Sequence, residues 1–255
     1  MPTGIPGADS VNPVTPALIQ QTTQLIGRPP QFMGRYFCRA DRPSPYEYGH
    51  REENGPLHDS NLKLLPVADQ TPQVGGSREE GVSDGQGNVG DLLATFDPGY
   101  LASLGNEFLV FLDVEGNPSL SVNYYAGWAE TLMSASQTQS GGRFTLLPAV
   151  YGSRDDRQTW EALQQAGQQG AACYGVWVAA YLTQSADSIP VVWPDWDEHQ
   201  TTPQGAQLTC PVLLWQYAGN FPNSSEYAPL DCNMTNPAID AAQFLSRLIL
   251  PPTQS

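Results

Sequence analysis

Short apolar runs alternate with amphipathic stretches along this chain of 255 residues. The run from Phe108 to Val114 (FLVFLDV) is apolar at nearly every position, as expected for a strand that is covered on both faces. Apolar runs that alternate with helical segments are typical of βα units and a parallel sheet. The candidate strands are a first one that ends at Ala8-Asp9, then Phe32–Phe37, Leu62–Ala68, Phe108–Val114, Phe144–Tyr151, Tyr174–Ala180, Val212–Tyr217 and Leu230–Asn233.

Helical segments follow the first five strands and are largely missing between the later ones. The clearest helix begins at Thr15, a capping residue followed by Pro16 at the first helical position, and it stops at Gly27. From Leu182 to Thr209 there is no helical period, so long loops are expected between the last three strands. Further helices are expected over Leu120–Met133, Asp155–Ala166 and Pro237–Leu248.

This order of elements predicts one α/β domain over residues 1–255. Its expected architecture is a single irregular TIM-type (β/α) barrel, with about five βα units followed by three strands without helices. The length fits, since such a barrel takes about 250 residues, and no repeat or linker divides the chain. The polar, Gly-rich stretch Thr71–Gly90 follows the third strand. We expect it to be a long loop at the C-terminal face of the barrel, where active sites form.

The charge balance excludes some partners. The net charge is −15, the pI is near 4.3, and Lys63 is the only lysine. Phosphate binding needs clustered cations, so neither nucleic acid nor an anionic membrane surface is an expected partner. No stretch approaches the roughly 18–20 apolar residues of a membrane span, and no signal peptide is visible. Only 15% of residues are charged, which is typical of exported proteins. The composition favours action outside the cell or at the cell envelope, while a chain that stays inside, export without such a signal and a trimmed sequence remain alternatives. A monomer is expected.

The cysteines and histidines do not have the spacing of metal ligands, so no metal or other cofactor is expected. Cys210 and Cys232 bracket a candidate strand and could pair across a loop, although free buried thiols are an equal alternative. A metal-dependent deacetylase would need an Asp/His/His set. His50 and His58 lie eight residues apart on a predicted loop and helix, too far apart to share one ion.

Two carboxylates end the fourth strand. Successive residues of a strand point to opposite faces, so Asp113 and Glu115 share one face, about 6.5–7 Å apart along the chain. Two carboxylates so confined cannot both ionise without cost, so one should have a raised pKa and donate a proton while the other stays charged. Glycosidic bond cleavage requires this division, and the spacing fits both retaining and inverting geometry. The plainer interpretation is a strand end whose acids cap a loop.

Two further carboxylates are expected beside this pair. Asp9 ends the first candidate strand and Asp231 lies in the eighth. The first and eighth strands are neighbours in a closed barrel. Both side chains can therefore project into the mouth that holds Asp113 and Glu115.

Aromatic side chains gather at the strand ends and in the late loops. Sugar rings stack on such side chains, while the polar tips of Tyr and Trp bind hydroxyls. We expect at least half of these aromatics to belong to the core, and Trp193 and Trp196, in the acidic loop WPDWDEH, to be exposed platforms. The full set is Tyr151, Trp177, Tyr181, Trp193, Trp196, Trp215 and Tyr217.

The run LVFLDVEGNPS, followed by YYAGWAETL, resembles the fourth strand and next helix of glycoside hydrolase family 25, the lysozyme or muramidase family. That family has an irregular barrel of five βα units and then three strands without helices. The first third of the chain is also similar to the glycoside-hydrolase-like domain of unknown function 1906, whose second strand carries Gly-Arg-Tyr, here GRYF. Other matching segments are GADS (Gly7–Ser10), VWVAAY (Val176–Tyr181), LLWQY (Leu213–Tyr217) and LDCN (Leu230–Asn233).

The resemblance implies a hydrolase of β-linked amino-sugar glycans, with peptidoglycan as the expected substrate and partner. It implies Glu115 as the general acid, with Asp9, Asp113 and Asp231 as supporting carboxylates. Asp113 would orient or stabilise a substrate whose N-acetyl group can itself assist the reaction. The alternative is a catalytically silent barrel that binds glycan or a protein partner. The strong negative charge departs from the muramidase pattern, because like-charge fields slow the encounter with an anionic cell wall.

Overall fold

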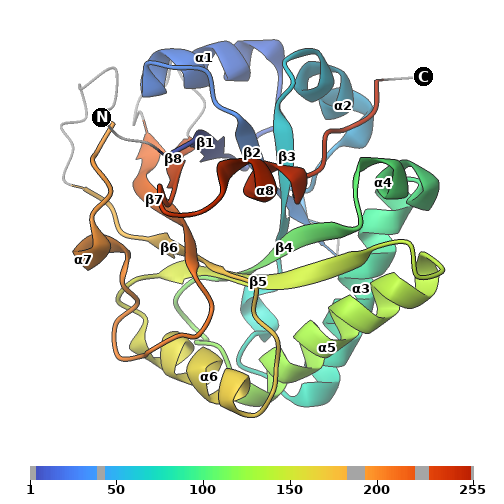
Figure 1. Cartoon of the computed structure of the whole chain (residues 1–255), viewed down its shortest axis with the longest axis vertical. Helices are drawn as coiled ribbons and strands as arrows, with labels where there is room; N and C mark the ends of the chain where they lie inside the picture. The colour runs from blue at the N-terminus through green and yellow to red at the C-terminus, as the bar shows by residue number, and fades with distance from the viewer. Residues whose placement is uncertain (1–3, 39–43, 183–192, 222–229, 254–255) are drawn as a thin grey trace.

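The computed structural model describes residues 4–38, 44–182, 193–221 and 230–253, and within these ranges eight strands close into a barrel in chain order (Figure 1). Strands β1 to β7 are parallel neighbours, whereas β8 is antiparallel to both β7 and β1. The predicted α/β barrel is confirmed. The strands are β1 (Pro6–Asp9), β2 (Phe32–Phe37), β3 (Lys63–Ala68), β4 (Glu107–Val114), β5 (Thr145–Ser153), β6 (Val176–Ala179), β7 (Val212–Phe221) and β8 (Leu230–Thr235).

Helices follow each of the first five strands, as the sequence predicted. The first begins where expected, because the Thr15 side chain accepts a hydrogen bond from the Leu18 amide at 3.1 Å. It ends at Gly27, whose φ of 74° is left-handed. The helices are α1 (Pro16–Ile26), α2 (His50–Asp59), the 3₁₀ turn η1 (Thr71–Gln73), α3 (Arg78–Thr95), α4 (Pro98–Leu104), α5 (Val122–Gln139), α6 (Arg157–Gln168), α7 (Glu198–Thr201) and α8 (Ala241–Ser246).

The stretch Thr71–Gly90 is not the long loop that its glycines predicted. It contains η1 and most of α3. Glycine in a helix interior costs about 1 kcal/mol relative to alanine, which is why the sequence favoured a loop. Here the glycines let two helices pack closely, since a Cβ atom on Gly81 would collide with the carbonyl oxygen of Tyr124 in α5. Packing between α3 and α5 therefore overrides the local preference.

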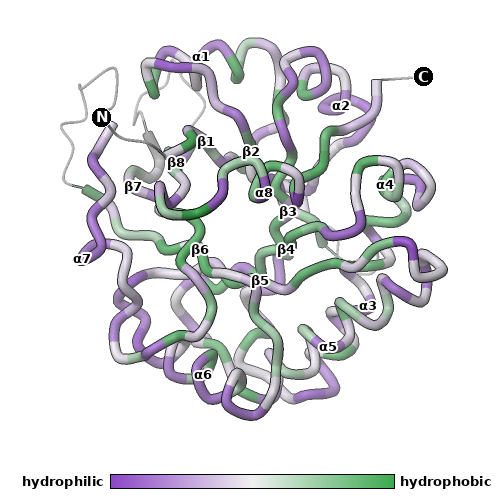
Figure 2. The backbone as a smooth tube through the Cα atoms, viewed as in Figure 1, coloured by the Kyte–Doolittle hydropathy of each residue, from purple (hydrophilic) through white to green (hydrophobic). Residues whose placement is uncertain are grey.

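The core has two layers. One fills the barrel interior and includes Phe32, Phe111 and Trp177, while the other lies between the strands and the surrounding helices. The hydrophobic segments accordingly concentrate on the strands of the ring in Figure 2. Helix α8 lies over the β2 and β3 side of that ring, and its Phe244 packs edge-on against Phe32, 5.6 Å between ring centroids, in the interior layer (Figure 1). This end of the barrel is thus closed, which leaves the C-terminal ends of the parallel strands for a site.

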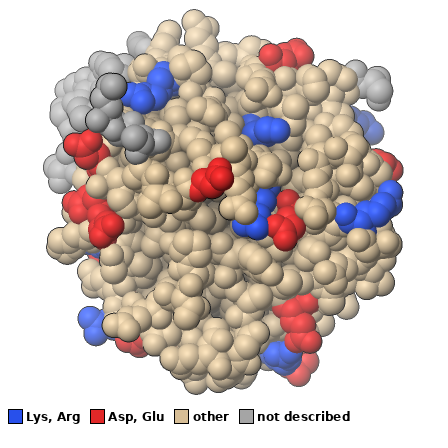
Figure 3. Space-filling model, viewed as in Figure 1, with Lys and Arg blue, Asp and Glu red and all other residues tan. Residues whose placement is uncertain are grey.

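The surface carries few charges. On the face seen in Figure 3 most of the surface is neutral, and the Lys and Arg side chains lie apart from one another. No helix in the described part of the chain has both the length and the apolar character to cross a membrane.

Candidate active site

The four predicted carboxylates come together at the open end of the barrel. Asp113 is the second-last residue of β4, and Glu115 is the first residue after that strand. Asp9 ends β1 and lies opposite Asp231 on β8. Asp231 reaches this end because β8 is antiparallel, so that its beginning lies beside the ends of the other strands. The Gln216 amide nitrogen joins two of the carboxylates, donating to Asp9 Oδ1 at 3.0 Å and to Asp231 Oδ2 at 3.2 Å.

Asp113 is the inner member of the predicted pair. It is 4% exposed, whereas Glu115 is exposed. Its Oδ2 accepts a hydrogen bond from the Thr71 hydroxyl at 2.8 Å, but Oδ1 is buried with no partner among the described residues. Burial raises the pKa of Asp113 well above its ordinary value, and the charge of Glu115 raises it further. The raised pKa expected for one member of this pair therefore falls on Asp113.

Asp9 is the second carboxyl at the mouth with a raised pKa. Burial raises its pKa well above the ordinary value, and the nearby charge of Asp231 adds to the effect. Hydrogen bonds from Asn233 Nδ2, at 2.6 Å, and from Gln216 oppose the shift because they stabilise the ionised form. The charge of Glu115 contributes as well. The charge of Glu115 therefore raises the pKa of both Asp9 and Asp113 at the barrel mouth.

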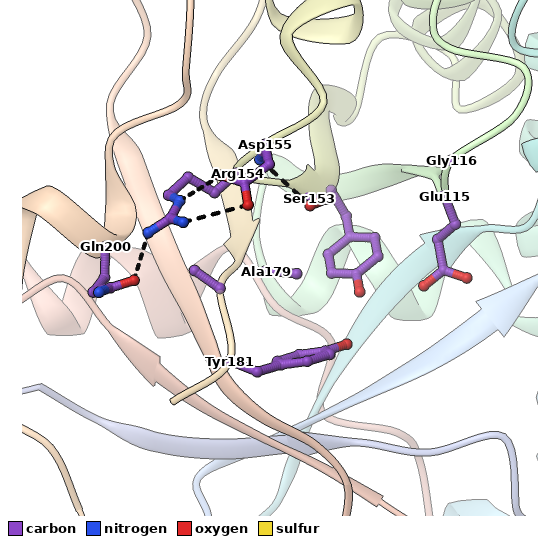
Figure 4. A pocket seen from close by; sticks show the side chains of 10 residues that line it. Glu115, Gly116, Ser153, Arg154, Asp155, Ala179, Tyr181 and Gln200 are labelled. Carbon is purple, nitrogen blue, oxygen red and sulfur yellow. Dashed lines mark hydrogen bonds and ion pairs between the residues drawn. The ribbon is translucent and has the colours of Figure 1, made fainter. Parts of the chain in front are cut away.

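Glu115 lines an open pocket of about 360 Å³ at this end of the barrel (Figure 4). In Figure 4 the Glu115 carboxylate is on one side of the pocket, Arg154 and Gln200 are on the other, and the Tyr181 ring lies between them. The lining combines a carboxylate, a guanidinium, amide and hydroxyl groups with an exposed aromatic ring. The lining residues are Glu115, Gly116, Tyr151, Ser153, Arg154, Asp155, Ala179, Ala180, Tyr181 and Gln200.

Three of the predicted aromatics lie at the site. Tyr151 is in register with Asp113 on one side and with Trp177 on the other. The hydroxyls of Tyr151 and Tyr181 both donate to Gln216 Oε1, at 2.8 and 2.9 Å, and the Trp177 indole donates to Asn233 at 2.9 Å. Tyr181 is 54% exposed, while Tyr151 and Trp177 are buried. Tyr181 is therefore the one of these three rings that a ligand can stack against.

The other four predicted aromatics do not line this pocket. Trp215 and Tyr217 are buried in the outer layer, because strand alternation points Gln216 inward and its two neighbours outward. Trp193 and Trp196 are only partly exposed and pack edge-on against Tyr217 and Trp215, with centroid distances of 6.0 and 6.1 Å. Trp193 and Trp196 are therefore not the fully exposed rings that the sequence predicted, and their contact with substrate stays a prediction.

Several site residues were missed in the sequence. Gln216 and Asn233 donate hydrogen bonds to the carboxylates. Strand alternation could have identified Asn233, because it is two residues after Asp231 and shares its face of β8. Tyr36 is also at the mouth: burial and the charges of Asp113 and Asp9 raise its pKa. Strand alternation could have identified Tyr36 too, because it is two residues after Gly34 and shares its face of β2.

Gly34 makes room for the site. It is in register with Asp9, and a Cβ atom there would lie 2.7 Å from the Asp9 Cβ and 3.3 Å from the Trp177 ring. Any side chain at this position would displace one of the two. The glycine of the GRYF segment therefore sets the close approach of β2 to the Asp9 carboxyl.

The described residues contain no group of three or more His, Cys, Asp and Glu side chains placed to hold a metal ion. All four cysteines are free thiols. Cys210 lies beside Cys173 at a shared pocket and hydrogen-bonds to it, while Cys232 is buried beside Tyr217, so the considered Cys210–Cys232 pair is not brought together. His58 contacts the carbonyl oxygen of Pro251 at 2.8 Å, away from the mouth.

No protein-family model matches the sequence, and a search of curated proteins also gives no match. Solved structures match over nearly the whole chain. An uncharacterized B. stearothermophilus protein is 21% identical, with a TM-score of 0.69 over 96% of this chain and 100% of that one. The catalytic domain of endolysin Ply40, from bacteriophage P40 of Listeria monocytogenes, is 14% identical, with a TM-score of 0.50 over 96% and 98%. GHIP, a glycosyl hydrolase 25 of Streptococcus pneumoniae, is 15% identical, with a TM-score of 0.52 over 97% and 94%.

These comparisons define the class of fold. The chain has a barrel similar to that of glycosyl hydrolase 25 proteins, at low sequence identity. Fold likeness alone does not assign chemistry, because one fold hosts many functions. The chemistry of this chain depends on its carboxylates and its pocket.

Proposed function

We propose that this protein is a glycoside hydrolase that cleaves β-linked amino-sugar glycans, with peptidoglycan as its substrate. The observation that carries the proposal is the joint placement of Asp9, Asp113, Glu115 and Asp231 at the open end of a barrel, beside a pocket that Glu115 lines. Perturbed carboxyl groups in a cleft are typical of functional sites. The fold shared with a glycosyl hydrolase 25 and with an endolysin catalytic domain supports the same chemistry.

In the proposed reaction Glu115 is the general acid. It is the exposed member of the pair, so it can reach the oxygen of a glycosidic bond in the pocket. Asp113 is the buried member of the pair, and burial, with the charge of Glu115 added, raises its pKa. Asp113 then orients the substrate's acetamido group, while Asp9 and Asp231 act as supporting carboxyl groups at the mouth.

Replacement of Glu115 by Gln tests the proposal. We expect Glu115→Gln to lower the rate of muropeptide release from purified peptidoglycan by roughly 10²- to 10⁴-fold, because general acid catalysis contributes about that much. Glu161→Gln, which removes an exposed carboxylate on α6, is the matched control and should keep the wild-type rate. Unchanged muropeptide release by Glu115→Gln would refute the assignment of the acid.

The alternative is a barrel that binds glycan or a protein without turnover. Its support is the similarity to a B. stearothermophilus protein that is itself uncharacterized. Glycan binding by wild type without any released product would favour this alternative. The retention of all four carboxylates in one cluster favours turnover.

A further inference from the structure

Arg154 forms the wall of the pocket that faces Glu115. It is the one cationic side chain among the described residues that line the pocket, in a protein with a net charge of −15. In Figure 4 its guanidinium and the Gln200 amide lie on the side opposite the Glu115 carboxylate. A group bound along the Tyr181 ring therefore has an acid at one end and hydrogen-bond donors at the other.

The backbone fixes Arg154 between two strand ends. It directly follows β5, its amide donates to the Ala179 carbonyl at the end of β6 at 2.9 Å, and its own carbonyl accepts from Gln204 at 3.0 Å. The side chain is 20% exposed. Arg154 is therefore anchored in the barrel wall rather than carried on a free loop.

The guanidinium is also fixed in orientation. Its Nε donates to Asp155 Oδ1 at 2.7 Å, its Nη2 to Asp155 Oδ2 at 3.3 Å, and its Nη1 to Gln200 Oε1 at 2.6 Å. A guanidinium has five N–H groups, so two remain for a ligand. The Gln200 amide presents its carbonyl to Arg154, which leaves its NH₂ group as a further donor. This side of the pocket therefore offers free donors beside the Asp155 carboxylate, and an ionised carboxylate, which only accepts hydrogen bonds, is the ligand group that matches those donors.

We propose that Arg154, with Gln200, binds a carboxylate carried by the glycan, while a sugar ring lies against Tyr181 and the scissile bond is at Glu115. This inference rests on the proposed function and specifies its substrate as an anionic glycan. Because Asp155 already pairs with Arg154, the contact depends on directed hydrogen bonds rather than on a net positive charge. A purely architectural Arg154 would instead serve only to hold Gln200 and Asp155.

The test uses three substrates and matched variants of the whole protein. The substrates are peptidoglycan fragments with their stem peptides, peptide-free glycan strands that keep the carboxylate on the sugar, and the same strands with that carboxylate converted to a neutral amide. The variants are Arg154→Gln, Arg154→Lys and the control Arg157→Gln, which removes an exposed cation at the start of α6 that does not line the pocket. KM, kcat and equilibrium binding are measured for each pair.

We expect Arg154→Gln to raise KM about tenfold on the carboxylate strands, the usual size for loss of a charged hydrogen bond. On the amidated strands KM should stay within about twofold of wild type, with kcat little changed on both. Arg154→Lys should recover part of the loss, and Arg157→Gln should match wild type. A loss confined to fragments with stem peptides would place the bound carboxylate on the peptide rather than on the sugar.

Two results would overturn the inference, and they are distinguishable. If wild type acts on all three substrates but Arg154→Gln changes them equally or not at all, Arg154 does not read the carboxylate and the proposed hydrolase stands. If wild type neither cleaves nor binds any of the three, the proposed function fails and this inference fails with it.

Discussion

The molecule buries an ion pair between β2 and α2 and a group of carboxyls at the ends of β1 and β4, and it stabilises the two groups differently. On the outer side, Arg35 is paired with Glu53 of α2 through bonds of 2.7 and 3.0 Å, and its third nitrogen donates to the Ser10 carbonyl at 2.6 Å. Both side chains are 0% exposed. On the inner side, Asp9 and Asp113 face other carboxylates, and no cation of the described chain forms an ion pair with either.

The paired charges stabilise the fold, whereas the carboxyls without a cation are suited to chemistry. A buried charge that is fully paired holds elements together, and here Glu53 also accepts from the Val14 and Gly49 amides at 2.8 and 2.7 Å, which fixes the loop after Asp9. Buried carboxyls without a counter-ion lower stability at neutral pH. Such groups are concentrated at functional sites, where their perturbed pKa is useful.

The largest stability effect should come from breaking the outer pair. Arg35→Met leaves the Glu53 carboxylate buried without its cation, and we expect a loss of roughly 3–5 kcal/mol in the free energy of unfolding. Urea unfolding followed by circular dichroism measures it. The double variant Arg35→Met/Glu53→Leu should lose less than the sum of its two single variants, because neither charge is then left alone. Additive losses would show that the two side chains act independently.

The inner group should respond in the opposite direction. Asp113→Asn removes a carboxyl whose folded-state pKa is raised. Below the unfolded pKa of about 3.9 both states bind the proton. As pH rises, the unfolded chain ionises first and wild type loses stability until the folded pKa is passed. Asp113→Asn should therefore unfold with a free energy about 1–2 kcal/mol higher than wild type at neutral pH, and close to it at pH 3.5.

Unfolding by urea at a series of pH values checks this expectation. The control is Asp59→Asn, an exposed carboxyl at the end of α2, which should follow wild type at every pH. A variant at Asp113 that is less stable than wild type at neutral pH would mean that its carboxylate is stabilising, contrary to the comparison. Glycan cleavage should fall in the same variant even as its stability rises.

The smallest effect is expected for an ion pair at the surface. Arg78 and Glu130 join α3 to α5, but their side chains are 48% and 69% exposed. Exposed pairs contribute little because water and salt screen them, so Arg78→Met should change the free energy of unfolding by about 0.5 kcal/mol or less. The same urea experiment applies. A loss as large as that of Arg35→Met would show that burial is not what distinguishes the two pairs.

Local signals explain how much of the fold was predictable. Thr15, Pro16 and Gly27 act at the ends of α1 itself, so the helix could be located from sequence. Helix α3 was missed because the reason for its glycines lies in another helix, where the Tyr124 carbonyl needs the space over Gly81. Contacts between distant segments leave no mark on local propensity.

The candidate site divides in a similar way. The carboxylates at strand ends were predictable, since Asp113 and Glu115 share a face by simple alternation. The aromatic residues of the site were harder to predict. Trp215 and Tyr217 were predicted to bind sugar, but both belong to the outer layer, and the residue between them, Gln216, points into the mouth. The role of Gln216 depends on partners from four strands or their ends, and only the closed barrel brings them together.

Gln216 has one further consequence, for the mechanics of the mouth. Its nitrogen faces the two carboxylates of Asp9 and Asp231, and its oxygen receives the hydroxyls of Tyr151 and Tyr181. One planar amide thus ties the exposed Tyr181 ring to groups inside the barrel. The ring is a stiff platform rather than an adaptable one, so a sugar that stacks on it meets a surface whose orientation is set before binding.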